Sequence, residues 1–429
     1  MLRILCVLCL FSVLFCEEIH RLPLGNPDHC WDLRLISVNG IYDSILDKEI
    51  LWDEIIQKAS LSKVIFTGES HTNLEHHLLQ ARLIESLALS GKKVIVGMEF
   101  FEISQQPVLD EWSKGEMNEI ELLQKSDWFN KVGYNYRYYK PIMDVAKKYR
   151  LQMIALNIPR SIVHKVAQKS LHSLSKEESA LFPLVDTNHT QHRYLLKKIF
   201  GKFVLLAPEM FENLYAAQCV WDVAMSHYTL KAIENCDEQS IMVVLAGSNH
   251  VIYNLGIPMR FSKSSSLSTE SIFFMEIAPE KPQKKAAPET KSESNKPETK
   301  SESNKKDPHF KMSYQEMQEK EIFSRSLARW VIGTKSSDGQ EAFPSPGIKL
   351  AWKENAMEIV SVSEKGIASQ AGWKKGDKIQ TLGNTRLASL VDAQIFLTYL
   401  SWESSFSWEI LREEKIIQGT TTIQKPNAE

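Results

Sequence analysis

Four acidic and imidazole side chains stand where apolar, strand-like segments end. Glu69 and His71 follow the first such segment, Glu99 ends the second, and Asn249 and His250 follow a third. Carboxylates and imidazoles in one place can bind a metal ion, supply an acid and a base, or hold a polar cofactor. Helix capping is the alternative, because acidic residues also stabilise the amino end of a helix. We favour one shared site for the four.

The elements that must position these residues alternate between apolar runs and helical patterns. The runs are KVIFTG (63–68), KVIVGMEF (93–100), LQMIALN (151–157) and SIMVVLAG (240–247), and residues 160–235 have only helical spacing. This pattern predicts an α/β domain whose parallel sheet is flanked by helices, with an inserted helical subdomain. SIFFMEI (271–277) is expected to add an edge strand. Carboxyl ends of parallel strands share one rim, which would bring the four side chains together.

Five segments carry a resemblance to a known family. GESHTNLEHHLLQARLIESL, GMEFF, ALNIPRSIVHKVA, LYAAQCVWDVAM and VVLAGSNHVIYNLGIPMRF occur in order between residues 60 and 261. Together they make residues 38–278 resemble the ChaN-like haem-binding family, which is distantly similar to the Tiki proteases and erythromycin esterases. The sequence departs from the family at Thr72, where an acidic residue is common, and at Asn249, where glycine is common.

The resemblance implies haem as cofactor and partner, held by Glu69, His71, Glu99, Asn249 and His250. Exported haem carriers commonly bind ferric iron through a tyrosine phenolate. GYNYRYYKPI (133–142) offers four tyrosines, and Tyr139, in the family-like YKP context, is our first choice. Arg160 is expected to pair with a haem propionate, as are the cations Arg137 and Lys140. His76, His77, His189 and His192 carry less weight, and no metal is assigned.

Composition limits the class of protein. The chain has 429 residues, of which 43% are hydrophobic and 24% charged, so two or three globular domains are expected. The net charge of -2 does not favour a nucleic-acid partner. No nucleophile elbow, P-loop or Rossmann glycine triplet is present.

The first sixteen residues read as a signal peptide, because their apolar run is too short to span a bilayer. We therefore expect an exported protein, either periplasmic or anchored in the cell envelope as a lipoprotein through Cys16.

The second half of the chain divides by composition. Residues 279–309 lack aromatic side chains apart from a final histidine and contain PETKSESNK twice, which indicates a disordered linker. A helical connector is expected at 310–346. Residues 347–417 resemble a small, β-rich PDZ-like domain, carried by Ala371, Gly372, Gly376 and Asp377, with a flexible tail at 418–429. Gly347 and Ile348 would receive the carboxylate of a peptide partner.

Three functions follow from these observations. The leading hypothesis is an exported haem or iron-cofactor binding protein for uptake or trafficking, whose PDZ-like domain docks a partner; a homodimer stays open. The second is a hydrolase in which Glu69, His71, Glu99 and His250 bind a metal ion or activate water. The third is an envelope adaptor that acts only through peptide binding.

Overall fold

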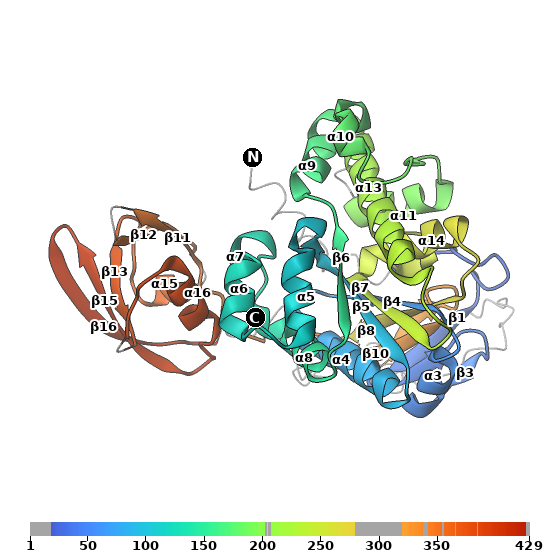
Figure 1. Cartoon of the computed structure of the whole chain (residues 1–429), viewed down its shortest axis with the longest axis horizontal. Helices are drawn as coiled ribbons and strands as arrows, with labels where there is room; N and C mark the ends of the chain where they lie inside the picture. The colour runs from blue at the N-terminus through green and yellow to red at the C-terminus, as the bar shows by residue number, and fades with distance from the viewer. Residues whose placement is uncertain are drawn as a thin grey trace, which may run out of the picture.

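A computed structural model describes residues 19–201, 204, 207–278, 320–337, 342–353, 356–364, 366–383 and 385–425. The expected signal peptide, the linker at 279–309 and the first residues of the expected connector lie outside these ranges. The described chain forms an α/β body and a smaller β-rich carboxyl-terminal domain (Figure 1).

The α/β body is built on one mixed sheet. Its order is β3-β2-β10-β8-β4-β7-β5-β6, and the six strands from β10 to β6 are parallel. The pairs formed by β2 with β3 and with β10 are antiparallel. The strands span Ile41–Asp43 (β2), Lys48–Glu49 (β3), Val64–Glu69 (β4), Lys93–Glu102 (β5), Gln152–Asn157 (β6), Ser240–Gly247 (β7), Thr269–Ile277 (β8) and Trp330–Lys335 (β10).

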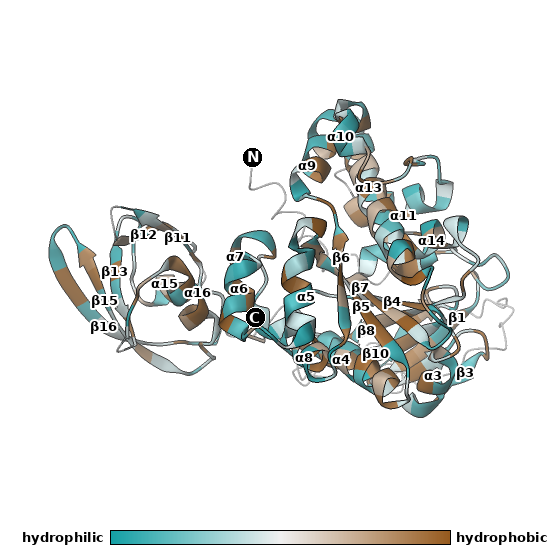
Figure 2. Ribbon diagram, viewed as in Figure 1, coloured by the Kyte–Doolittle hydropathy of each residue, from teal (hydrophilic) through white to brown (hydrophobic). Residues whose placement is uncertain are grey.

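Helices cover both faces of this sheet, which is why its central strands are apolar throughout (Figure 2). One face packs against α3 (Trp52–Ala59), α4 (Leu74–Leu89), α5 (Gln106–Lys114) and α8 (Tyr136–Lys148). The other face packs against α13 (Pro208–Ile233) and α14 (Ile257–Ser264). The remaining helices of the body are α6 (Glu119–Lys125), α7 (Trp128–Lys131), α9 (Arg160–Lys169), α10 (Lys176–Ser179) and α11 (Thr190–Phe200).

The apolar runs predicted as strands are strands, and the described residues between β6 and β7 form helices as predicted. The edge position predicted for SIFFMEI is wrong. This segment is β8, which lies inside the sheet between β4 and β10. The neighbour that covers its outer edge arrives much later in the sequence.

The helical connector predicted at 310–346 is wrong over its described part. Residues Lys320–Ser324 form β9, which pairs with β1 (Leu33–Ser37) in a two-stranded sheet, and β10 follows at once. The apolar residues do recur at helical spacing, but WVIGT carries a tryptophan and the β-branched Val331, Ile332 and Thr334, which favour a strand. The open edge of β8 offers that strand its hydrogen bonds.

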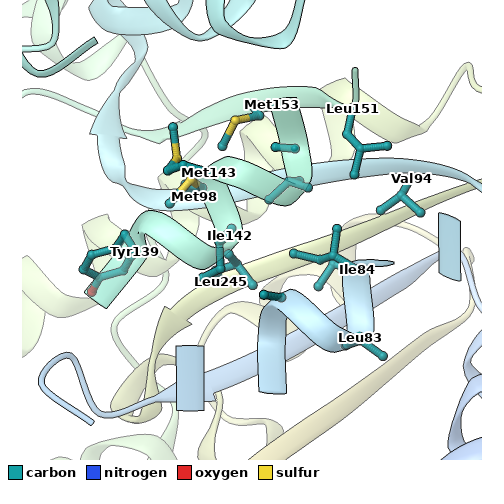
Figure 3. Close-up of a cluster of buried hydrophobic side chains, with 14 of the residues drawn as sticks. Leu83, Ile84, Val94, Met98, Tyr139, Ile142, Met143, Leu151, Met153 and Leu245 are labelled. Carbon is teal, nitrogen blue, oxygen red and sulfur yellow. The ribbon is translucent and has the colours of Figure 1, made fainter. Parts of the chain in front are cut away.

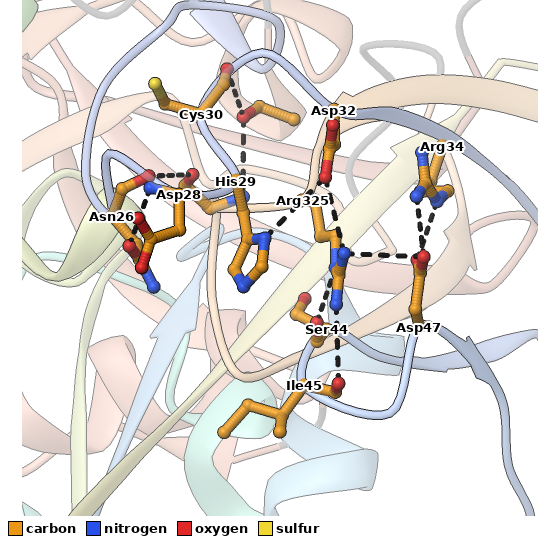
Figure 4. Close-up of polar contacts among 12 residues, drawn as sticks. Asn26, Asp28, His29, Cys30, Asp32, Arg34, Ser44, Ile45, Asp47 and Arg325 are labelled. Atoms are coloured by element: carbon orange, nitrogen blue, oxygen red, sulfur yellow. Dashed lines mark hydrogen bonds and ion pairs between the residues drawn. The ribbon is translucent and has the colours of Figure 1, made fainter.

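The α/β body therefore does not end at residue 278. Arg325, from the turn between β9 and β10, binds the carboxylates of Asp32 and Asp47 at 3.3 and 3.4 Å and the Ser44 carbonyl at 2.7 Å (Figure 4). The start is also earlier than residue 38, since Leu22 and Leu24 are buried.

The carboxyl-terminal domain is β-rich, as expected. Its sheet has the order β11-β12-β13-β15-β16, with β14 paired to β13. The elements are β11 (Ile348–Lys353), β12 (Ala356–Val362), α15 (Ile367–Gln370), β13 (Lys378–Leu382), β14 (Thr385–Arg386), α16 (Leu390–Thr398), β15 (Ser405–Arg412) and β16 (Lys415–Thr422). The flexible tail predicted at 418–429 is wrong up to Ile423, because β16 pairs along β15 and Ile423 is buried.

Candidate functional site

The sheet order places the four acidic and imidazole residues at one rim. β7 lies between β4 and β5, so the ends of these three strands are neighbours. Glu69 is the last residue of β4, Glu99 lies near the carboxyl end of β5, and His250 follows β7 in a short helical turn. The site at this rim (Glu69, His71, Glu99 and His250) is called the rim site below.

Glu69 is the buried anchor of one half of the rim site. Its Oε1 accepts a hydrogen bond from the Tyr139 hydroxyl at 2.8 Å and lies 3.1 Å from His71 Nδ1, and its Oε2 lies 3.4 Å from His77 Nδ1. Burial opposes ionisation, but His77, His71 and the Tyr139 hydroxyl together lower the pKa of Glu69 to about 2. Glu69 is therefore a carboxylate at neutral pH.

His71 is the member of the rim site with the largest exposure, 27% of its side chain. Its ring lies 5.0 Å from the Phe100 ring and 4.9 Å from the Tyr134 ring. Burial disfavours its charge, but Glu69 and Glu99 outweigh this and raise the pKa of His71. The imidazole also lies against Gly247, where a Cβ would come within 2.9 Å of Cε1, so the end of β7 needs a glycine.

The other half of the rim site is a buried chain of charges. His250 Nδ1 lies 2.6 Å from Asp222 Oδ1, and its Nε2 lies 3.5 Å from Glu99 Oε1. Glu99 Oε2 accepts a hydrogen bond from the Gly247 amide at 2.6 Å. Burial alone would lower the pKa of His250, but attraction to Glu99 and the hydrogen bond with Asp222 raise it to about 10. His250 is thus an imidazolium between two carboxylates.

Asp222 was not predicted from the sequence. It lies on α13 with no exposed surface, and its Oδ2 is 3.3 Å from Arg260 and 3.5 Å from His192. The available signal was a single aspartate within the apolar stretch CVWDVAM, because a buried carboxylate needs charged partners. His192 and His77, which received little weight, are both buried beside these carboxylates.

The remaining predicted residues lie in different surroundings. Tyr139 is fully buried at the end of an apolar cluster (Figure 3), and its hydroxyl donates to Glu69. Burial and the negative charge of Glu69 raise the pKa of Tyr139 well above its usual value. Asn249 is exposed. Arg160 begins α9, where its backbone amide donates to Glu102.

The two cations expected beside the propionates are engaged elsewhere. Arg137 donates to the Leu400 carbonyl at 3.0 Å and its guanidinium lies 4.0 Å from the centre of the Phe343 ring. Lys140 forms ion pairs with Glu119 and Asp144. Tyr134, by contrast, is a half-buried tyrosine next to His71.

The described parts of the chain offer few side chains for metal or thiol chemistry. No cluster of three or more histidine, cysteine, aspartate or glutamate side chains there could hold a metal ion. The described cysteines, Cys30, Cys219 and Cys236, are free thiols. Cys219 is buried on α13.

The predicted peptide-binding residues lie at the open edge of the carboxyl-terminal sheet. β11 is the first strand of that sheet and begins at Ile348, and Gly347 before it has a φ of 63°. The Gly347 carbonyl accepts a hydrogen bond from the Ser363 amide at 2.7 Å.

Across the described ranges, no helix is long and apolar enough to cross a bilayer.

Similar proteins cover parts of the chain. A chloroplastic RETICULATA-RELATED 5 protein of Arabidopsis thaliana is 20% identical over 55% of this chain, which spans only a third of that protein's length. ChaN of Campylobacter jejuni, whose structure shows cofacial heme binding, is 18% identical, with a TM-score of 0.46 and coverage of 55% of this chain and 90% of ChaN.

Two further solved structures are similar over different regions. An erythromycin esterase mutant in its open conformation is 14% identical, with a TM-score of 0.34 and coverage of 59% of this chain and 81% of the esterase. An HtrA-type protease AlgW with a decapeptide is 15% identical, with a TM-score of 0.19 and coverage of 20% of this chain and 31% of the protease. At the level of sequence family, residues 55–261, a stretch slightly shorter than half of the chain, match the model described as haem-binding uptake, Tiki superfamily, ChaN.

Proposed function

We propose that the α/β body binds haem at the rim site. The observation that supports this most is the match of residues 55–261, which hold the whole rim site, to a family described as haem-binding. The rim also offers chemistry that suits a flat, anionic ligand. His71 is partly exposed, its pKa is raised by Glu69 and Glu99, and its ring lies beside the aromatic rings of Phe100 and Tyr134.

Each residue of the rim would contribute differently to holding haem. The raised pKa of His71 favours the protonated imidazole, which cannot ligate iron, so His71 suits a propionate carboxylate better than the metal. A phenolate is a good ligand for ferric iron. Tyr134, which lies at the rim, suits this role better than Tyr139, whose buried hydroxyl is bound to Glu69. Bound haem would supply the iron chemistry, and these side chains would orient and retain it.

The export of the chain and a docking role for its second domain complete the proposal. An uptake or trafficking protein of the cell envelope needs an export signal, which the first sixteen residues would provide. A peptide terminus could add a strand beside β11, the open edge that begins at Ile348. The envelope location, a lipid anchor at Cys16 and the identity of the partner belong to this proposal.

An absorbance titration with hemin tests the haem site. The purified chain should show a saturable Soret shift, and elemental analysis should find no stoichiometric zinc. Tyr134→Phe should weaken binding at least tenfold. Tyr139→Phe is the matched control, since it removes the same hydroxyl from a buried tyrosine and should leave the Soret position of the complex unchanged. Bound zinc together with no response to hemin would overturn the haem assignment.

A hydrolase is the second candidate, and the buried chain of Glu99, His250 and Asp222 favours it. An imidazolium held between carboxylates, at the same rim as the partly exposed His71 and its buried partner Glu69, could supply general acid and base groups. This candidate predicts measurable hydrolysis of an activated ester such as p-nitrophenyl acetate. His71→Ala should abolish that hydrolysis, and equal rates in the two proteins would exclude the candidate for this substrate class.

A further inference from the structure

The loop that carries His71 of the rim site is held by a strand from the far end of the body. This loop, residues 70–73, links β4 to α4; it contains His71 and follows directly after Glu69, the last residue of β4. Its outer side faces β10, which the chain supplies only after residue 319. β10 lies outside the residues that match the haem-binding family, so family resemblance predicts nothing about this contact.

The contact is a directed chain of hydrogen bonds through His76. The Ser70 amide donates to His76 Nδ1 at 2.9 Å, so this nitrogen is unprotonated and the proton lies on Nε2. That Nε2 lies 3.0 Å from Thr334 Oγ1 and donates to it. The Thr334 hydroxyl in turn donates to the Met275 carbonyl of β8 at 3.2 Å. Every donor in this chain has an acceptor, and His76 and Thr334 are almost fully buried.

Neighbouring contacts hold the same loop to the same strand. Asn73 Nδ2 donates to the Lys335 carbonyl at 3.2 Å and to Glu276 Oε1 at 3.0 Å. The Lys335 amide donates to Glu75 Oε2 at 2.9 Å. The segment from Ser70 to His76, which is the loop and the start of α4, is therefore tied to the carboxyl end of β10.

The chain beyond β10 also contacts α8, the helix that carries Tyr139. The Ala342 amide donates to the Tyr138 hydroxyl at 3.0 Å, and the Phe343 ring lies 5.0 Å from that of Tyr138. Tyr138 lies on α8 and is followed directly by Tyr139, which donates to Glu69.

We propose that the chain beyond residue 319 completes the rim site, with Thr334 and His76 as positioning residues that fix the loop that follows Glu69 and carries His71. This inference deepens the haem-binding proposal and rests on it. Without the Thr334 hydroxyl, the buried Nε2–H of His76 has no acceptor. An unpaired buried donor is unfavourable, so the His76 ring is expected to shift and its hydrogen bond from the Ser70 amide to weaken. His71 follows Ser70 directly, so its ring would lose its fixed position over Gly247.

The test compares Thr334→Val, which keeps the shape but loses the hydroxyl, with Thr334→Ser, which keeps the hydroxyl. Thr229→Val is the matched control, because the Thr229 hydroxyl is buried on α13 without a hydrogen-bond partner. Hemin affinity and the amide exchange of Ser70 are measured on the full chain. We expect Thr334→Val to weaken hemin binding roughly 3- to 10-fold and to speed Ser70 exchange about as much. Thr334→Ser and Thr229→Val should stay within about twofold of the parent chain.

The two readouts separate this inference from the proposed function. If the parent chain does not bind hemin, the haem proposal fails, and Ser70 exchange alone decides whether Thr334 positions the loop. Unchanged exchange and unchanged affinity in Thr334→Val would overturn the inference. If that variant does not fold, His76→Asn takes its place, since asparagine can still accept from Ser70 but does not reach Thr334. The same changes are expected, and their absence has the same meaning.

Discussion

Replacing Asp222 by asparagine removes one of the two carboxylates that hold His250 in its charged form. The pKa of His250 is raised from 6.5 to about 10, against the effect of burial, by Glu99 and by Asp222. Such a group stabilises the fold fully below pH 6.5, and this contribution is lost as the pH rises through about 10. Asp222→Asn should therefore lower the free energy of unfolding most at pH 6 and less at pH 10.

The magnitude follows from the size of the pKa shift. A rise from 6.5 to about 10 corresponds to about 5 kcal/mol of unfolding free energy. Glu99 and Asp222 share the effect, so we assign about 2–3 kcal/mol to Asp222. A second, pH-independent loss is expected because Arg260 and His192 also lose their charged neighbour. The total at pH 6 should reach about 3–5 kcal/mol, as for other broken buried ion pairs.

Urea unfolding of the parent chain and the variant at pH 6, 8 and 10 measures this difference. Asp237→Asn is the control, because Asp237 pairs with Lys93 at the surface with half of its side chain exposed. That substitution should cost less than about 1 kcal/mol and equally at pH 6 and 8. A loss for Asp222→Asn that is the same at pH 6 and pH 10 would refute the charged state assigned to His250.

Three further results are expected. Gly247→Ala should displace the His71 ring, since the added Cβ would lie 2.9 Å from it; NMR should show altered His71 ring shifts, and hemin affinity should fall severalfold while the fold persists. His71→Ala and His250→Ala should each weaken hemin binding at the rim site. A double-mutant cycle should show that the double variant loses less binding free energy than the sum of the two single losses. Asp377→Asn should destabilise the carboxyl-terminal domain by about 1.5–3 kcal/mol, measured by its unfolding transition, because it breaks the paired 2.7 Å bonds from Arg412.

The parallel core of the fold was predictable because each of its first four strands is a short, continuous apolar run. Strands buried on both faces need such runs, and turn or helix signals bound each of them. β10 was not predictable in this way. It pairs with β8 across more than fifty residues of intervening sequence, and its six residues do not indicate which strand it will pair with.

Only part of the rim site follows from the sequence. The strand-end rule leads to Glu69, His71, Glu99 and His250, because the position of a strand end depends on the sheet alone. The partners of these residues come from helices, as Asp222 does from α13 and Tyr139 from α8. Which face of a helix meets the rim depends on tertiary packing, and so the buried state of Tyr139 did not follow from its YKP context.

The late arrival of β10 sets an order in which this chain can fold. A chain that is synthesised from its amino end exposes the outer edge of β8 until residue 335 has followed. An unpaired strand edge is a template for pairing with other chains. A fragment cut at residue 278 would keep this exposed edge for good, and we expect it to self-associate. The outer edge of β8 is sealed by a strand that comes after the proline- and lysine-rich segment, so pairing along this edge of the parallel sheet is completed last.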